Sequence, residues 1–129
     1  MDSSQHIVLY VMLVVGVFTL KQFVADFVLQ TNWMAQGKAR LQNWQLPLLA
    51  HAGTHGVLCV LVTVISVPNL WWFGAIDFAI HMVIDFGKSK IGHRTGWGVA
   101  DAPYWMLFGF DQLLHHITGL VLAYFVVVA

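Results

Sequence analysis

Four long apolar segments make up most of this chain, and they limit what it can fold into more than any other feature. They lie at about 6–30, 46–67, 70–88 and 103–128. Each is near the ~20 residues that an α-helix needs to cross the hydrocarbon core of a bilayer. We therefore expect a single domain, residues 1–129, that folds as an all-α integral membrane protein with a four-transmembrane-helix bundle.

The scarcity of charged residues excludes an ordinary soluble domain. Hydrophobic residues make up 59% of the chain and charged residues only 9%, against about 25% charged residues in soluble proteins. Six acidic residues, all of them Asp, and six basic residues cannot form the solvated surface of a soluble protein of 129 residues. The expected environment is the lipid bilayer, and the formal net charge of zero gives no indication of a nucleic-acid partner.

Basic residues predict the orientation of the spans. Five of the six lie in or beside the connections 31–45 and 89–102: Lys38, Arg40, Lys88, Lys90 and Arg94. The sixth, Lys21, lies inside the first span, and the sequence assigns it no role. By the positive-inside rule, both long connections face the cytoplasm and both termini lie on the non-cytoplasmic side. We expect a multi-pass protein of the bacterial inner membrane.

Polar residues spaced four apart interrupt each apolar segment toward the end predicted to face the cytoplasm. Residues at this spacing share one face of a helix. Each span carries one such pair: Asp26 and Gln30, His51 and His55, His81 and Asp85, Asp111 and His115. A four-helix bundle would bring these pairs together in its centre at matching depth.

Three interpretations of this polar centre remain open: a metal site, a proton or ion pathway, and a structural hydrogen-bond network. A polar contact between membrane helices contributes only ~0.6–2 kcal/mol. An ionisable group at mid-membrane costs ~2.5 kcal/mol or more. Because Ser, Thr or Asn would link helices at lower cost, we favour a functional centre and place the metal site first.

Imidazole and carboxylate are the ligands of zinc, manganese and non-haem iron. We expect a divalent metal ion, zinc first and manganese or iron as alternatives, with this ligand pool: His51, His55, His81, Asp85, Asp111 and His115. The expected catalytic groups, acting as general base or proton shuttle, are Asp26 and Asp111, and Asp26 is alternatively a ligand or a residue that supports the ligands. Supporting or substrate contacts are expected from Gln30, Asp77, Lys88, Gln112 and His116. For Lys88, we prefer snorkelling toward the interface over pairing with Asp85 or holding an anionic headgroup.

The same residues carry a resemblance to a known family. Its segments are Asp26–Met34 with Gly37 and Lys38, His51 and His55, His81–Asp85 with Lys88, and Asp111–His115. In this combination the chain resembles a family of small bacterial and phage membrane proteins, domain of unknown function 3307, over nearly its whole length. The resemblance implies a four-span helical protein. A weaker similarity to small inner-membrane proteins described as metal-dependent hydrolases implies hydrolysis.

We therefore expect a metal-dependent hydrolase whose substrate is a lipid or another amphiphile, because the polar centre lies below the headgroup level. The alternatives are a divalent-metal or proton transporter or channel, a bis-His haem protein, and a structural or regulatory membrane subunit. The outer halves of the spans are nearly pure Val, Leu, Ile and Phe, which leaves no visible exit path for an ion. A homodimer is also expected, because five glycines in the spans permit close helix packing: Gly16, Gly53, Gly56, Gly74 and Gly119.

Overall fold

The computed structural model describes residues 2–129, and this range contains helices and connections but no strand. Four helical segments are long and apolar enough to cross a membrane: Ser3–Val28, Gln45–Ser66, Pro68–Thr95 and Ala102–Val128. Their α-helices are α1 (Ser3–Phe23), α3 (Gln45–Ser66), α4 (Phe73–Thr95) and α5 (Ala102–Val128). The expected all-α, four-span architecture is confirmed, and it indicates a multi-pass membrane protein.

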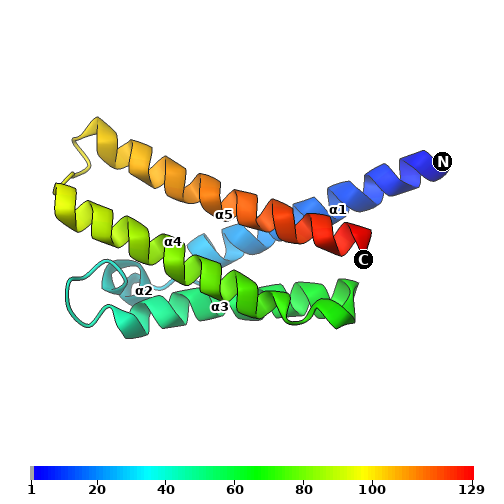
Figure 1. Ribbon diagram of the computed structural model, residues 1–129, viewed down its shortest axis with the longest axis horizontal. Coiled ribbons are helices and arrows are strands. Elements are labelled where there is room, and N and C mark those ends of the chain that lie inside the picture. The colour runs from blue at the N-terminus through cyan, green and yellow to red at the C-terminus, as the bar shows by residue number, and fades with distance from the viewer. Residues whose placement is uncertain (1) are drawn as a thin grey trace.

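The four long helices run along one common axis (Figure 1). Both termini lie at one end of the bundle, together with η2 (Pro68–Leu70), the tight 3-10 turn between α3 and α4. The short helix α2 (Asn32–Gly37) and the connection between α4 and α5 lie at the opposite end, here called the α2 end. The two long connections therefore share one end, and its assignment to the cytoplasm stays a prediction.

Two of the expected spans differ in detail from the structure. The first does not continue as a regular α-helix to residue 30, because Val24–Val28 form a π-helical turn, η1. In this turn the N–H of Leu29 donates to the carbonyl of Val24 at 2.9 Å. The third span continues to Thr95 rather than ending near 88, and Gly96, with a φ of 66°, terminates it in the left-handed region.

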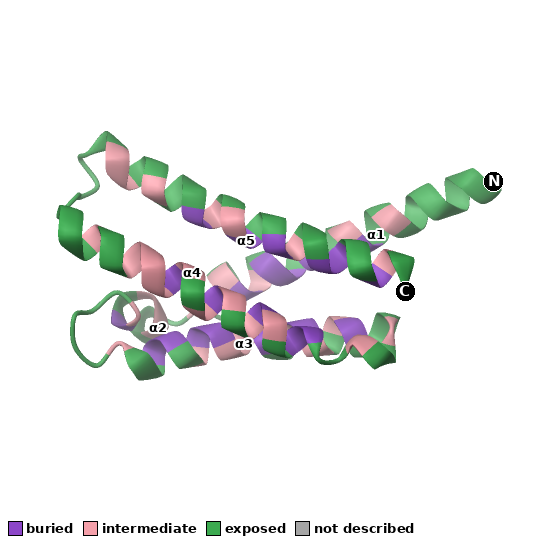
Figure 2. Cartoon of the chain, in the orientation of Figure 1, coloured by how far each residue is buried: buried purple, intermediate pink, exposed green. Residues whose placement is uncertain are grey.

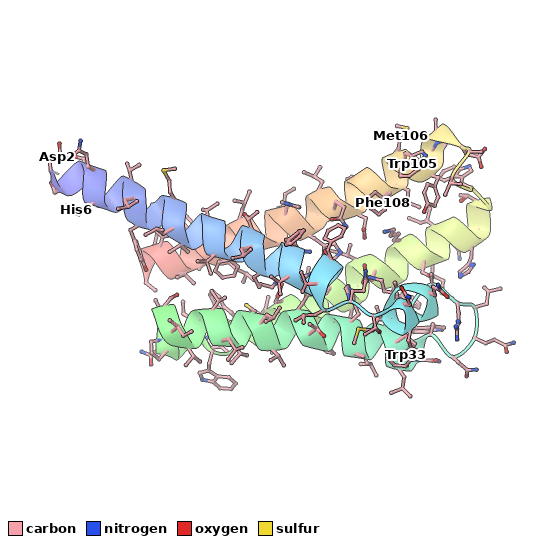
Figure 3. All side chains as sticks on the ribbon, turned by 180° about the vertical axis from the view of Figure 1, so that it is seen from behind. Asp2, His6, Trp33, Trp105, Met106 and Phe108 are labelled. Carbon is pink, nitrogen blue, oxygen red and sulfur yellow. The ribbon has the colours of Figure 1, made fainter. Side chains whose placement is uncertain are left out.

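Side chains with polar ends mark the two ends of the bundle. Trp33 on α2 and Trp105 on α5 lie at the α2 end, and Asp2 and His6 lie at the free end of α1 (Figure 3). Both tryptophans are exposed, as is usual for indole rings that sit at the boundary between hydrocarbon and water. We therefore expect the bilayer boundary nearest to the α2 end close to these two rings.

Burial follows the inward faces of the helices, whereas the outward faces are exposed and apolar (Figure 2). Toward the end with the termini, the buried residues form an apolar core: Val14, Phe18, Cys59, Phe73, Leu122, Ala123 and Val126. Toward the α2 end, the buried side chains are mostly polar. The bundle thus has an apolar half and a polar half.

Two glycines set the distance between α3 and α4. A Cβ atom built on Gly74 would lie 2.6 Å from the carbonyl oxygen of Gly56 and would also collide with Val60. A Cβ atom on Gly56 would lie 2.9 Å from the carbonyl oxygen of Gly74. Gly56 and Gly74 therefore serve a close contact within the chain, as expected for small residues between membrane helices. A homodimer stays a prediction.

We predict that Gly74→Ala destabilises the bundle by about 1–3 kcal/mol, because the added methyl group must force α3 and α4 apart. The measurement is the unfolding free energy in detergent micelles. Gly87→Ala on the same helix is the matched control, because its new methyl group would have no atom within 4 Å. If both variants have the same stability, the proposed close contact is wrong.

Candidate metal centre

Eight buried or nearly buried ionisable side chains from all four spans meet in the polar half of the bundle. The π-helical turn η1 supplies Asp26, and α3 supplies His51 and His55, one helical turn apart. The other five come from α4 and α5: Asp77, His81, Asp85, Asp111 and His115. The structure therefore brings together all six expected metal ligands and both expected catalytic residues.

The first group of possible ligands surrounds His51. Its Nε2 lies 3.4 Å from Oδ1 of Asp26 and 3.3 Å from Oδ2 of Asp85. Nε2 of His55 lies 3.0 Å from the same oxygen of Asp26. Asp26, His51 and His55 thus offer donor atoms that lie within 4.8 Å of one another, and Asp85 contacts this group through His51. Both rings are almost completely buried, whereas Asp26 and Asp85 line a cavity.

The second group lies on the other side of Asp85. Nε2 of His115 lies 3.4 Å from Oδ1 of Asp85 and 3.5 Å from Oδ1 of Asp111. Asp85 therefore directs one oxygen toward each group and connects them. Asp26, His51 and His55 form one cluster with metal-ligand spacing, and Asp85, Asp111 and His115 form another.

His81 lies between the two groups without joining either by a hydrogen bond. Its Nδ1 donates to the carbonyl of Asp77 at 2.9 Å and lies 3.2 Å from the Asp77 carboxylate. Its ring stacks on His55 with centroids 3.7 Å apart and on His115 at 4.2 Å. Rings in such contact leave no space for a haem plane between them, so this arrangement offers no bis-His haem site from these pairs.

Each of the four buried histidines has one ring nitrogen without a hydrogen-bond partner among residues 2–129: His51 Nδ1, His55 Nδ1, His81 Nε2 and His115 Nδ1. Buried polar atoms of folded proteins are normally paired. His81 shows the pattern of a metal ligand most clearly, because its Nδ1–H is held by a backbone carbonyl and its Nε2 is left available. In His51, His55 and His115 the unpaired atom is Nδ1, and it is Nε2 that faces the carboxylates of the centre.

Three lysines pair with carboxylates of the centre. Lys38 Nζ lies 2.8 Å from Oδ2 of Asp85, and Lys88 Nζ lies 2.8 Å from Oδ2 of Asp111. Lys21 pairs with Asp77 in the deepest of the three contacts. Asp26 has no lysine partner among residues 2–129; its second oxygen accepts a hydrogen bond from the Gln22 amide at 2.8 Å.

Sequence reasoning missed two of these lysines and preferred another role for the third. Lys88 does not simply snorkel toward the interface, because its ammonium group pairs with Asp111 rather than with Asp85 or water alone. Lys38 was expected only to mark the cytoplasmic connection. Lys21 had no assigned role, although a charge inside an apolar helix requires a partner and Asp77 was the deepest acid. That requirement was the signal that could have found this pair.

The remaining expected residues lie around the centre rather than in it. Gln30 donates to the backbone carbonyl of Asp26 at 2.9 Å. Gln112 donates to Oδ2 of Asp111 at 3.2 Å. His116 is exposed, and its Nδ1 donates to the carbonyl of Gln112 on its own helix, so it forms no interhelical bond there.

A cavity of about 200 Å³ reaches the centre from the α2 end. It lies between η1, α2, α4 and α5, and its charged lining residues are Asp26, Lys38, Asp85, Lys88, Asp111 and His115. Water or a polar group of a substrate can therefore reach carboxylates of both ligand groups. His51, His55 and His81 do not line this cavity and lie behind it.

Comparison with known proteins gives one match. A family model described as "Protein of unknown function (DUF3307)" matches residues 9–129, a range that contains every residue of the polar centre. No curated protein and no solved structure matches the chain.

We predict that Lys21→Met destabilises the protein by about 3–5 kcal/mol, because it leaves the Asp77 carboxylate buried without its counter-charge. The double variant Lys21→Met/Asp77→Asn should recover most of this loss, since Asn keeps an acceptor for His81 and removes the charge. Unfolding in detergent micelles measures both effects. The exposed Lys90→Met is the control and should change stability by less than about 0.5 kcal/mol. An unrecovered double variant would contradict a pairing role for Lys21.

Proposed function

The chain belongs to the DUF3307 family, and we propose that it is a metal-dependent hydrolase of the bacterial inner membrane that acts on a lipid or another amphiphile. The observation that carries this proposal is the arrangement of Asp26, His51 and His55, whose donor atoms lie within 4.8 Å of one another, with Asp85 beside His51. The predicted orientation would open the centre to the cytoplasm through the cavity at the α2 end.

The distances within this group fit a zinc ion. Zinc bonds of about 2.0–2.1 Å in a tetrahedron require ligand atoms about 3.3–3.4 Å apart. Oδ1 of Asp26 lies 3.4 Å from Nε2 of His51 and 3.0 Å from Nε2 of His55. We assign the first ion position to Oδ1 of Asp26, Nε2 of His51 and Nε2 of His55, which leaves the fourth tetrahedral position for a water molecule.

The second group supports a second ion position. Asp85, Asp111 and His115 offer three donor atoms at comparable distances, with Asp85 as the bridge. His81 belongs to a third possible ligand group, with His55 and Asp77. Manganese and iron also accept imidazole and carboxylate ligands, so the choice of zinc rests on the tetrahedral spacing of the first group.

A divalent ion held here would acidify a bound water molecule and polarise a carbonyl or phosphoryl oxygen. The residues of the chain would supply the rest of the chemistry. When only the first ion position is filled, Asp111 is the better candidate for the general base, because it lines the cavity and its Oδ1 has no hydrogen-bond partner among the described residues. Asp26 faces two histidines with one oxygen and Gln22 with the other, which suits a ligand more than a base.

We predict that the purified protein contains close to stoichiometric divalent metal and that His55→Ala or Asp26→Ala lowers the metal affinity at least ~10-fold, because even supporting residues of metal sites contribute that much. Elemental analysis and competition with a chelator measure this effect. His116→Ala is the matched control, since His116 lies outside the donor set. Equal metal content in folded wild type, His55→Ala and Asp26→Ala would overturn the metal centre.

Transport of a divalent ion or proton is the second candidate, because the Lys21–Asp77 pair extends the polar region deeper into the bundle. The apolar core between this pair and the end with the termini argues against it, since the buried residues there offer an ion no polar ligand other than Cys59 and Thr63.

Two assays separate the candidates. We predict that the reconstituted protein gives no saturable metal uptake into proteoliposomes, whereas ester or phosphoester hydrolysis in mixed micelles stops with a chelator and returns with added zinc. If the wild-type protein takes up metal, Asp85→Ala abolishes this uptake, and no hydrolysis is detected, the protein is a transporter and the hydrolase proposal is wrong.

A further inference from the structure

A second, outer cavity of about 350 Å³ adjoins the inner one between α2, α4 and α5. The inner and outer cavities share five lining residues: Ala35, Lys38, Asp85, Lys88 and Phe108. A molecule that reaches the ligand groups by this route must pass between the two lysines. Lys38 comes from the end of α2 and Lys88 from α4, so they approach the passage from different elements.

The two lysines of the passage differ from the buried Lys21. The Lys21 side chain is 3% exposed and Asp77 is 1% exposed, so this pair is closed to other ligands. The side chains of Lys38 and Lys88 are 20% and 32% exposed. An ammonium group has three N–H donors, and each of these two uses one on a carboxylate. If Lys38 and Lys88 only compensated the charges of Asp85 and Asp111, their ammonium groups would not need to be accessible from the cavity.

The rest of the outer cavity has one acidic residue, one serine and several aromatic, aliphatic and small residues. Asp85 is its one acidic lining residue, and that carboxylate already pairs with Lys38. His93 adds a third group that can carry positive charge, and the remaining larger residues are Trp97, Tyr104, Leu107 and Phe108. Lys88 also lies over the Phe108 ring, with Nζ 4.7 Å from its centroid. An anionic head with an apolar chain matches this combination of ammonium groups and aromatic walls.

We propose that Lys38 and Lys88 bind the phosphate group of an anionic amphiphile and hold it at the entrance to the His/Asp centre. This inference names the substrate class of the proposed hydrolase, so the role of the bound molecule as a substrate rests on that proposed function. The binding itself requires only the two lysines and the cavity. It can therefore be tested on protein from which metal has been removed.

The experiment is calorimetric titration of dodecyl phosphate into chelator-treated protein in dodecyl maltoside micelles. Loss of one charged hydrogen bond corresponds to about a tenfold or larger loss of affinity. We expect this loss for Lys38→Gln and for Lys88→Gln, and a smaller one for the Lys→Arg variants. Lys90→Gln is the matched control, because Lys90 is two residues away on α4 and lies over Phe86 outside both cavities.

Equal weakening in Lys90→Gln would reduce the binding to general attraction by surface charge and overturn the proposal. If inorganic phosphate binds as tightly as dodecyl phosphate, the apolar chain contributes no affinity, and the proposal that the ligand is an amphiphile is overturned. If the purified protein contains no metal but still binds dodecyl phosphate, the proposed hydrolase is wrong and the phosphate site is supported. The two proposals can therefore fail separately.

A second measurement uses the wild-type chain and does not depend on the folding of variants. Dodecyl phosphate should slow modification of Lys38 and Lys88 by an amine-reactive reagent several-fold, with Lys90 as the internal reference. Mass spectrometry of the digested protein reports all three positions. Uniform modification with and without the ligand would overturn the proposal.

Discussion

The neutralisation of four carboxylates inside a membrane bundle is the constraint on which this structure depends. A charged group that lacks a partner in this environment costs several kcal/mol. Three of the carboxylates have a lysine, and the fourth, Asp26, has two histidines and a glutamine. These contacts connect α1 to α4, α2 to α4, α4 to α5 and η1 to α3. The charge pairs thus fix how the helices sit around the centre, while the apolar core and the Gly56–Gly74 contact hold the other half together.

This constraint also gives the site its chemical character. Asp26 is the one carboxylate of the four that no lysine contacts among the described residues. The imidazoles of His51 and His55 lie beside this carboxylate instead. A divalent cation would find at this point the carboxylate and imidazole donor atoms that it requires.

The spans and the polar faces could be predicted from the sequence because they depend on local spacing. His51 and His55 share a face on any α-helix, and His81 and Asp85 do so as well, so their meeting required only that the helices form a bundle. The lysine partners could not be predicted in this way. A lysine side chain is long, and its partner depends on the tertiary arrangement, as Lys88 shows by reaching Asp111 on α5 and not Asp85 on its own helix. The π-helical turn under Asp26 also has no clear signal in Val24–Val28. It is nevertheless the kind of irregularity that often accompanies functional residues.

The pairing of Lys21 with Asp77 has a consequence for how the protein enters the membrane. The two residues are 56 positions apart, and the first span is synthesised and meets the bilayer before its partner exists. A lysine within a span opposes insertion, by up to about 3 kcal/mol where it lies at the centre of the helix. The first span is also the most apolar of the four, so its hydrocarbon side chains can offset this cost until the α3–α4 hairpin arrives. Substitutions that make the first span less apolar would therefore impair membrane insertion in the cell, even where the folded bundle tolerates them.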